Sequence, residues 1–265
     1  ISLDHMQFLG NTVREIAGEK AGIIVPGVPV IYDGNDEDAA EVIAAKAKEL
    51  GSPAYKVVQD GAKVLGNNKD GIDFSLEDDY YGDTRFHIPF IAWYQVMNAS
   101  LALTTMEVLK DRIPVTMEQL QAGIANTRWQ GRMETILPGV IVDGAHNEDG
   151  VRRFVETAER FQKEYPLTLL FSAVNDKDYQ DMIHTICSRI KFRKVVTTEV
   201  GGYREVPSAE LAEIFCKEGC KDVGNSDNIE EAFHMAHEAK GEDGMLFCVG
   251  SLYLVGEIKT LLLKK

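Results

Sequence analysis

The chain has 265 residues, of which 45% are hydrophobic and 26% charged, enough to bury the core of one large domain or two ordinary ones. Its 42 acidic and 28 basic residues give a formal net charge of −14. Neither half of the chain has a basic excess, which argues against nucleic acid as a partner, because phosphate contacts need clustered Lys and Arg. No apolar run reaches the length of a membrane span, so we expect no membrane partner.

The four cysteines predict a reducing compartment. Cys187, Cys216, Cys220 and Cys248 are too few and too irregularly spaced for a disulfide scaffold, and no signal-like segment opens the sequence. We therefore expect a cytoplasmic protein. The first residue is Ile1, within a segment typical of the end of a strand, so we also expect a segment of the natural protein to precede it.

The first half of the sequence predicts a mixed α/β region. Thr12 and Glu15 have the spacing of a capping box, which predicts a helix that starts at Thr12 and stops at Gly22. Further elements predicted in this half are a strand at 28–32, a helix at 36–50, short antiparallel strands within 54–90, and helices at 93–110 and 117–125.

The second half predicts a parallel, doubly wound sheet, because apolar strands alternate regularly with helices. We therefore expect two domains, residues 1–128 and 129–265, with the boundary in the region Trp129–Arg132. The predicted strands lie at 139–143, 167–174, 194–199, 221–223 and 245–250, and the predicted helices at 150–164, 178–190, 208–218, 229–240 and 251–263.

Polar side chains follow the ends of two of these strands. Asp143 and His146 come directly after one apolar strand, and Ser251 follows another. Open α/β sheets bind ligands just beyond the carboxyl ends of their strands. Ser251 would open a helix, whose first N–H groups can hold a carboxylate together with the hydroxyl. The structural alternative for the first strand is an ordinary turn with Asn147 or Asp149 as the helix N-cap.

A second pattern suggests a metal site, but the sequence context disfavours it. Cys216-x₃-Cys220 is followed by His234-x₂-His237, a spacing that loosely resembles a zinc finger. Both histidines lie in a charged amphipathic helix, and Cys216 fits the apolar face of its own helix. We therefore expect no zinc at these residues.

Taken together, the sequence resembles the folylpolyglutamate synthase/dihydrofolate synthase branch of the Mur ligase superfamily. The matching segments are Ile1-Ser-Leu-Asp-His5, Glu19-Lys-Ala-Gly-Ile23, Asp143-Gly-Ala-His-Asn147 and Gly250-Ser-Leu-Tyr-Leu-Val-Gly256. The resemblance implies an incomplete Mur-ligase-type ATPase domain in residues 1–128 and a Rossmann-like glutamate-ligase domain in residues 129–265. The implied reaction is ATP-dependent amide formation through an acyl phosphate, with L-glutamate as the amine and dihydropteroate or folate as the acceptor. We expect a monomer.

The resemblance also implies roles in catalysis and in binding metal, nucleotide or amino acid. His5 and carbamylated Lys20 would bind Mg²⁺, and Lys20 and His146 would act in catalysis. ATP would be bound by Asn98, Arg132 and Asp143, and glutamate by His146 and Ser251. Lys177 would contact a phosphate. Carbamylation would give Lys20 the oxygen donors that Mg²⁺ prefers. Gln130 stands where the family has Pro before the Gly-Arg pair. The structural alternatives are a solvated Glu-Lys surface pair at Lys20 and an ordinary charged loop around Lys177.

The sequence contains no Gly-x₄-Gly-Lys-Ser/Thr motif, the loop that cradles phosphates in this family. In the family that loop lies upstream of the matching segments, so we predict that the 265-residue chain alone does not turn over ATP. Two alternative functions stay open. One is a peptidoglycan Mur ligase, disfavoured by the Asp143-Gly-Ala-His-Asn147 segment, and the other is a non-catalytic Rossmann-like binding or interaction domain.

Overall fold

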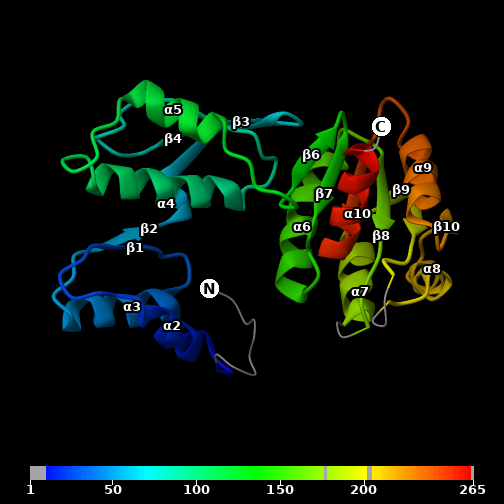
Figure 1. Ribbon diagram of the computed structural model, residues 1–265, viewed down its shortest axis with the longest axis horizontal. Helices are drawn as coiled ribbons and strands as arrows, with labels where there is room; N and C mark the ends of the chain where they lie inside the picture. Colours follow the sequence, from blue (N-terminus) through cyan, green and yellow to red (C-terminus); the bar gives the residue numbers. More distant parts are fainter. Residues whose placement is uncertain (1–9, 176–177, 202–204, 264–265) are drawn as a thin grey trace. The chain divides into compact units, whose positions relative to one another are not determined.

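The computed structural model describes residues 10–175, 178–201 and 205–263, and it divides the chain into two compact units (Figure 1). The first unit comprises Ile1–Thr127 and the second Arg128–Lys265. Within the described residues, no helix combines the length and the apolar character needed to cross a membrane.

The first unit begins with a parallel strand–helix–strand arrangement. Helix α2 (Val13–Ala21) precedes strand β1 (Val30–Asp33), which pairs in parallel with β2 (Ala54–Val57) through the crossover helix α3 (Glu37–Glu49). The sequence predicts antiparallel strands from residue 54, and for β2 this prediction is wrong, because the crossover helix returns the chain in its original direction. Ala21, Ile24, Ile43 and Ala47 form a small core between α2 and α3.

The capping box expected at the start of α2 is only half formed. The Thr12 hydroxyl accepts a hydrogen bond from the Glu15 backbone N–H at 3.2 Å. The reciprocal bond goes elsewhere, because the Glu15 carboxylate accepts from the N–H of Asn11 at 2.7 Å instead of from Thr12.

An antiparallel sheet with two helices completes the first unit. Its strands are β3 (Ala62–Asn68), β4 (Gly71–Leu76) and β5 (Phe86–Ile88), preceded by the short 3₁₀ helix η1 (Gln59–Gly61). Helices α4 (Tyr94–Val108) and α5 (Met117–Ala125) follow. The sheet and both helices share one core, in which Phe74, Phe86 and Leu103 are almost fully buried.

The second unit is built on a six-stranded sheet in the order β10-β9-β8-β11-β7-β6. All neighbours are parallel except β6, which pairs antiparallel with β7. The strands are β6 (Glu134–Leu137), β7 (Val140–Asp143), β8 (Leu167–Phe171), β9 (Phe192–Thr197), β10 (Val223–Asn225) and β11 (Met245–Val249). Every residue of β7, β8 and β11 is buried, as expected for central strands covered on both faces.

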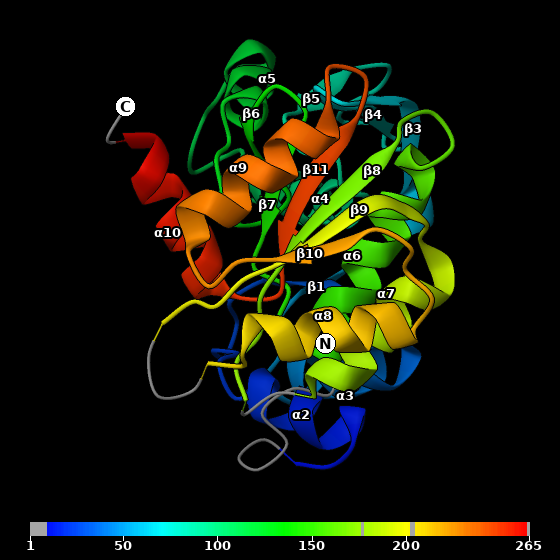
Figure 2. The ribbon, with the colours of Figure 1, turned by 90° about the vertical axis from the view of Figure 1, so that its right-hand side faces the viewer.

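Within the described part of this unit, five helices cover the two faces of the sheet. Figure 2 shows α6, α7 and α8 on one side and α9 and α10 on the other, and the packing of α6 on α7, α7 on α8 and α9 on α10 agrees. Their bounds are α6 (Glu148–Phe161), α7 (Tyr179–Arg189), α8 (Ser208–Lys217), α9 (Ile229–Lys240) and α10 (Leu252–Leu263). The doubly wound, mostly parallel sheet predicted from the sequence is thus confirmed.

Candidate functional site

The candidate site lies where β7, β11 and β8 end side by side. Asp143 at the end of β7 is in register with Val249 of β11, which is in register with Phe171 of β8. From β7 the chain passes into α6, whereas from β11 it passes into α10 on the opposite face (Figure 2). A crevice between two strands whose connections leave in opposite directions is where open α/β sheets bind ligands.

Asp143 joins two loops at this edge. It is 5% exposed, and its two carboxylate oxygens accept backbone N–H bonds from Met133 and from Ala145, each at 2.8 Å. Burial raises the pKa of Asp143 to about 6, although the two hydrogen bonds and the nearby Arg132 and His146 act in the opposite direction. The carboxylate therefore holds the loops of Met133 and Ala145 together by hydrogen bonds. Its contact with a nucleotide stays a prediction.

The segment that carries Arg132 has an unusual backbone. Gly131 has φ +66° and the buried Met133 has φ +46°, the single non-glycine residue with positive φ among those described. Such a conformation costs a non-glycine residue free energy, so surrounding contacts must hold it. The Asp143 bond to the Met133 N–H and a 2.8 Å bond from the Gly144 N–H to the Gly131 carbonyl do so. Arg132 is thereby fixed beside the end of β7.

A partly buried ion pair ties the same segment to α10. The Lys259 ammonium lies 2.7 and 2.9 Å from the two carboxylate oxygens of Glu134, and both side chains are about three-quarters buried. Glu134 also accepts a hydrogen bond from the Gly131 N–H at 2.8 Å. The helix that begins beside Ser251 is therefore anchored to the loop that carries Arg132.

His146 has a defined tautomer. Its Nδ1 lies 2.8 Å from the Gly144 carbonyl oxygen, which can only accept, so Nδ1 carries the hydrogen. This leaves Nε2 as the ring nitrogen that can accept a proton or a hydrogen bond. Asn147 is the N-cap of α6, since its side chain accepts from the Gly150 N–H at 2.9 Å. Of the two caps considered from the sequence, Asn147 is the one the structure uses.

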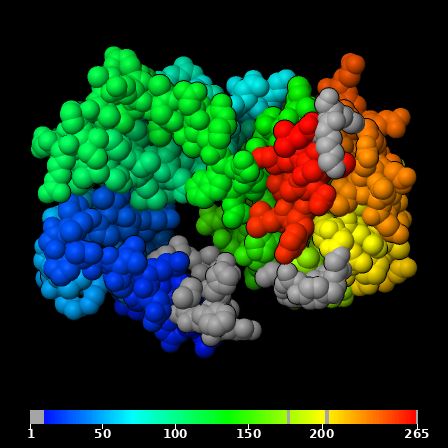
Figure 3. All heavy atoms as spheres, viewed as in Figure 1, coloured from blue at the N-terminus to red at the C-terminus, as the bar shows by residue number. Residues whose placement is uncertain are grey.

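Ser251 lies immediately before α10 and is almost fully buried. Its hydroxyl oxygen accepts from the Tyr253 N–H at 3.1 Å, and the residue is 2% exposed. Gly250 precedes it with φ +111°, and a Cβ at this position would lie 2.1 Å from the Ser172 carbonyl oxygen. The strand end is thus packed so closely that only glycine fits. The first turn of α10 lies at the surface of the second unit (red in Figure 3), with Leu252 51% exposed.

The structure gathers Arg132, Asp143, His146 and Ser251 at one sheet edge, as the sequence predicted for the strand ends. A Cβ on Gly144 would touch the Leu252 side chain at 2.2 Å, which places the loops after β7 and β11 against each other.

The remaining predicted residues lie elsewhere. Lys20 is exposed in the last turn of α2, and Asn98 is exposed on α4, where its Nδ2 donates to the Gln95 Oε1 at 2.8 Å. Both belong to the first unit. His5 and Lys177 fall outside the described residues.

The described residues do not by themselves fit a magnesium site. Among residues 10–175, 178–201 and 205–263 no group of three or more His, Cys, Asp and Glu side chains is arranged to hold a metal ion. Lys20 also offers no oxygen donor unless it is carbamylated. Magnesium binding through His5 and Lys20 therefore stays a prediction.

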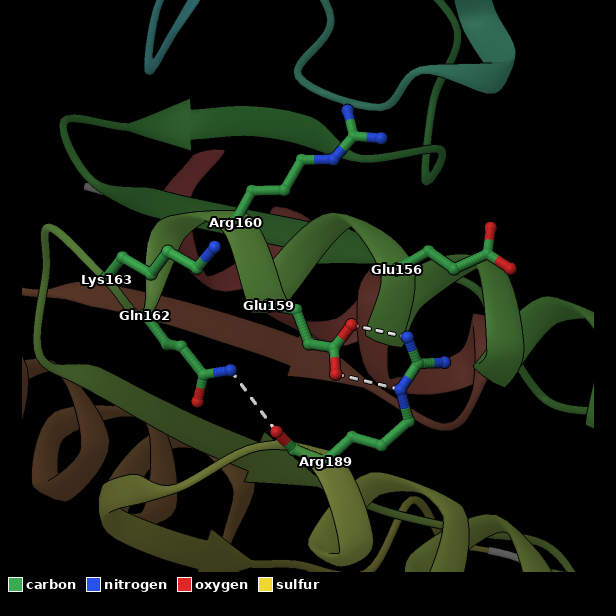
Figure 4. Close-up of a pocket in the computed structure, with 6 residues that line it drawn as sticks. All are labelled: Glu156, Glu159, Arg160, Gln162, Lys163 and Arg189. Atoms are coloured by element: carbon green, nitrogen blue, oxygen red, sulfur yellow. Dashed lines mark hydrogen bonds and ion pairs between the residues drawn. The ribbon is translucent and has the colours of Figure 1, made fainter.

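A surface hollow in the second unit is a poor candidate for the site. It encloses about 440 Å³ and lies along α6 and the end of α7 (Figure 4). Two of its five charged side chains pair with each other, since Arg189 forms two hydrogen bonds with the Glu159 carboxylate. The Arg189 carbonyl oxygen also accepts from Gln162 at 3.2 Å. Small-molecule sites are mostly apolar with a few convergent polar groups, and this hollow has neither property.

The mostly parallel sheet and its two helical layers define the second unit as a Rossmann-like domain. Residues 131–252 match the family model described as "Mur ligase, glutamate ligase domain". The dihydrofolate synthase/folylpolyglutamate synthase of Bacillus subtilis (strain 168) is 31% identical over 271 residues, which cover 98% of this chain and 60% of that protein. The folylpolyglutamate synthase of Lacticaseibacillus casei is 30% identical over 272 residues, covering 99% and 60%.

Solved structures give the same result. Folylpolyglutamate synthase from Thermotoga maritima superposes with a TM-score of 0.77 at 25% identity, covering 95% of this chain and 58% of that one. The apo form of the L. casei enzyme superposes with a TM-score of 0.78 at 26% identity, covering 99% and 60%. Most of the second unit thus matches the Mur ligase, glutamate ligase domain, and nearly the whole chain is homologous to folylpolyglutamate and dihydrofolate synthases. The chain spans about 60% of the length of these relatives.

Proposed function

We propose that this chain forms part of an ATP-dependent ligase that joins L-glutamate to dihydropteroate or to a folate. The observation that carries the proposal is the convergence of Arg132, Asp143, His146 and Ser251 at the carboxyl edge of a glutamate-ligase domain. A Mycobacterium tuberculosis folylpolyglutamate synthase, 25% identical to this chain, has been solved with ADP and AMPPCP. The named relatives act on folates, which favours a folate acceptor over a peptidoglycan precursor.

In the proposed reaction, a carboxylate of the acceptor attacks the γ-phosphorus of ATP, which gives an acyl phosphate and ADP. The amine of L-glutamate then attacks the acyl carbon and phosphate leaves, which forms the amide. Activation is needed because a carboxylate carries no good leaving group. Mg²⁺ would offset the charge of ATP when bound to the whole enzyme.

Each residue at the sheet edge has a proposed task. The N-terminus of α10 and the Ser251 hydroxyl provide a partly positive pocket for a glutamate carboxylate. His146, with Nε2 as acceptor, orients the incoming amine and takes up its proton as the amide forms. Arg132 presents a guanidinium to the phosphate groups, while Asp143 holds its loop in place.

The first unit would supply further nucleotide and metal contacts. We propose that Asn98 contacts ATP, that Lys20 as a carbamate and His5 hold Mg²⁺, and that Lys177 of the second unit contacts a phosphate. These assignments rest on the match to the family's segments. On the same basis, and on the few scattered cysteines, we propose a monomer that acts in the cytoplasm.

Isothermal titration calorimetry with L-glutamate and with ATP tests the proposal directly. We expect saturable glutamate binding that weakens at least tenfold in Ser251→Ala and in His146→Ala. Ser188→Ala is the matched control, because Ser188 lies on α7 and its hydroxyl donates to the Thr185 carbonyl, away from the sheet edge. If the folded chain binds neither ligand, or if Ser251→Ala binds glutamate as the control does, the non-catalytic interaction domain becomes the better interpretation.

A second measurement addresses catalysis. We expect the 265-residue chain alone not to hydrolyse ATP, because its sequence holds no phosphate-cradling loop. Glutamate-dependent release of phosphate by the purified chain would contradict this expectation.

A further inference from the structure

A pair of cysteines joins two elements of the second unit away from the candidate site. Cys187 is in the last turn of α7, and Cys220 follows the end of α8. Their Sγ atoms are 3.6 Å apart, and both residues are partly exposed. The other two cysteines differ, since Cys248 is fully buried in β11 and Cys216 is exposed on α8.

The same two segments are held together by a second interaction. His184, one helical turn before Cys187, places its Nδ1 2.9 Å from the carboxylate of Glu218. Gly219 then takes φ +93°, and the Cys220 N–H donates to the Phe215 carbonyl at 3.0 Å. This turn carries the chain from the end of α8 to Cys220 and directs that residue toward α7. The proximity of the two sulfur atoms is therefore set by the fold.

The two sulfur atoms are close enough for a disulfide to form after a small movement of the side chains. A disulfide has an S–S length of about 2.05 Å, so the atoms must approach by about 1.5 Å, which rotation about the side-chain bonds can supply. The hydrogen bond between the two thiols lowers the pKa of the Cys220 thiol, against the effects of burial and of Glu218. The same contact raises the pKa of Cys187. Cys220 is therefore the thiol that ionises first and attacks first.

We propose that Cys187 and Cys220 are a redox-modification site, which closes to an intramolecular disulfide by exchange with a low-molecular-weight disulfide such as oxidised glutathione. The Cys220 thiolate attacks one sulfur of oxidised glutathione, so that a mixed disulfide forms and one glutathione thiolate leaves. Cys187 loses its proton to solvent and attacks the Cys220 sulfur, which releases the second glutathione. The protein loses two hydrogens, and two molecules of reduced glutathione are formed.

Closure would tie α7 to the segment that leads into the edge strand β10. The two cysteines are 33 positions apart, so the bond closes a loop of intermediate length in the unfolded chain. Restricting the unfolded chain in this way stabilises the folded form, and we expect the thermal midpoint of the second unit to rise by about 5–10 °C. The site does not depend on the proposed ligase function.

Thiol counting and peptide mapping of the folded 265-residue chain test the proposal. After incubation with oxidised glutathione, free thiols should fall from four to two, and the intact mass should fall by about 2 Da. Non-reducing peptide mapping should show one cross-link, between the peptides that contain Cys187 and Cys220. The thermal midpoint should rise in the oxidised sample and return after reduction.

Three serine variants make the result specific. Cys216→Ser should leave the cross-link unchanged, because Cys216 is outside the pair. Cys187→Ser should stop at the mixed glutathione disulfide on Cys220, and Cys220→Ser should form no cross-link. The proposal is overturned if all four thiols of the folded wild-type chain survive oxidised glutathione, if the cross-link joins Cys216 to Cys220, or if Cys187→Ser still loses two thiols.

Discussion

Replacing Asp143 by Asn should change how the stability of the second unit depends on pH. Burial raises the pKa of Asp143 from 3.8 to about 6. Between these two values the folded unit keeps a proton that the unfolded chain has lost. The contribution to stability is therefore fully present below about pH 4 and is lost as the pH rises through about 6. Each pKa unit corresponds to about 1.4 kcal/mol, so the loss is about 3 kcal/mol.

The Asp143→Asn variant removes this dependence at a fixed structural cost. Its amide oxygen can replace one carboxylate oxygen, but its NH₂ group then faces the N–H of either Met133 or Ala145. Leaving one buried backbone donor unpaired costs about 1–3 kcal/mol. At pH 4 the wild-type carboxyl keeps its proton, so its hydroxyl faces one of these N–H groups much as the amide NH₂ does, and we expect Asp143→Asn to be no more than about 1–3 kcal/mol less stable than the wild type. By pH 7 the comparison should shift by about 3 kcal/mol in favour of the variant.

Urea unfolding between pH 4 and pH 7.5 measures the effect. Trp129 fluorescence reports on the second unit in a Trp93→Phe background, because the chain has two tryptophans and Trp93 belongs to the first unit. Parallel stability curves for the chains with and without the Asp143→Asn substitution would refute the reasoning, because they would show that burial does not perturb the carboxyl group.

Asp149→Asn is a control, because the pKa of Asp149 is shifted in the opposite direction to that of Asp143. Burial raises the pKa of Asp149, but hydrogen bonds from Arg152 and Arg153 outweigh it, and the net pKa is lowered. Its contribution is therefore present at neutral pH and is lost as the pH falls. The difference between wild type and Asp149→Asn should therefore stay constant from pH 7 down to about pH 5 and should shrink only as the pH falls below about 4, so its urea series is extended to about pH 2.5.

Two further predictions concern packing around the site. Gly250→Ala should destabilise the second unit by several kcal/mol, because its Cβ would lie 2.1 Å from the Ser172 carbonyl oxygen at a φ of +111°. Gly256→Ala in α10 is the control: its Cβ meets nothing within 4 Å, and it should stabilise the unit by about 0.5–1 kcal/mol. Thermal unfolding compares the two variants, and equal midpoints would contradict the expectation. Lys259→Met should lower the free energy of unfolding in urea by about 1–3 kcal/mol, because it leaves the partly buried Glu134 carboxylate without its cation. Adding Glu134→Gln should recover part of that loss. A double variant no more stable than Lys259→Met would show that the ion pair is not the cause.

The central strands and the site residues that follow them could be predicted from the sequence. Strands β7, β8 and β11 are continuous apolar runs, because both of their faces are covered by helices. In a parallel sheet all such strands end at the same edge, so the residues after them had to converge. For this reason the sequence alone could place Asp143, His146 and Ser251 together.

Features that depend on distant partners were missed. Strand β6 has only four residues, none fully buried, and its Glu-Thr-Ile-Leu sequence carries little periodicity. The parallel pairing of β1 with β2 was also missed, although the helix predicted at 36–50 between the two strands is the signal for a parallel crossover connection. The Asp143 bond to Met133 goes to a backbone N–H, which no side-chain pattern reveals.

The position of β11 has a consequence for how the second unit is made. This strand is the last of the six in chain order, yet it lies between β7 and β8 and pairs with both, with β8 along its whole length and with β7 from Leu246 to Val249. Until residues 245–249 have been synthesised, β7 and β8 lack the strand that pairs with both of them, so the six-stranded sheet cannot form. Assembly of this unit therefore depends on its last strand and on contacts between residues about a hundred positions apart, and such contacts form slowly. Before the last strand is synthesised, the apolar strands β7 and β8 are exposed in the nascent chain, and chaperones that bind exposed apolar segments would recognise them.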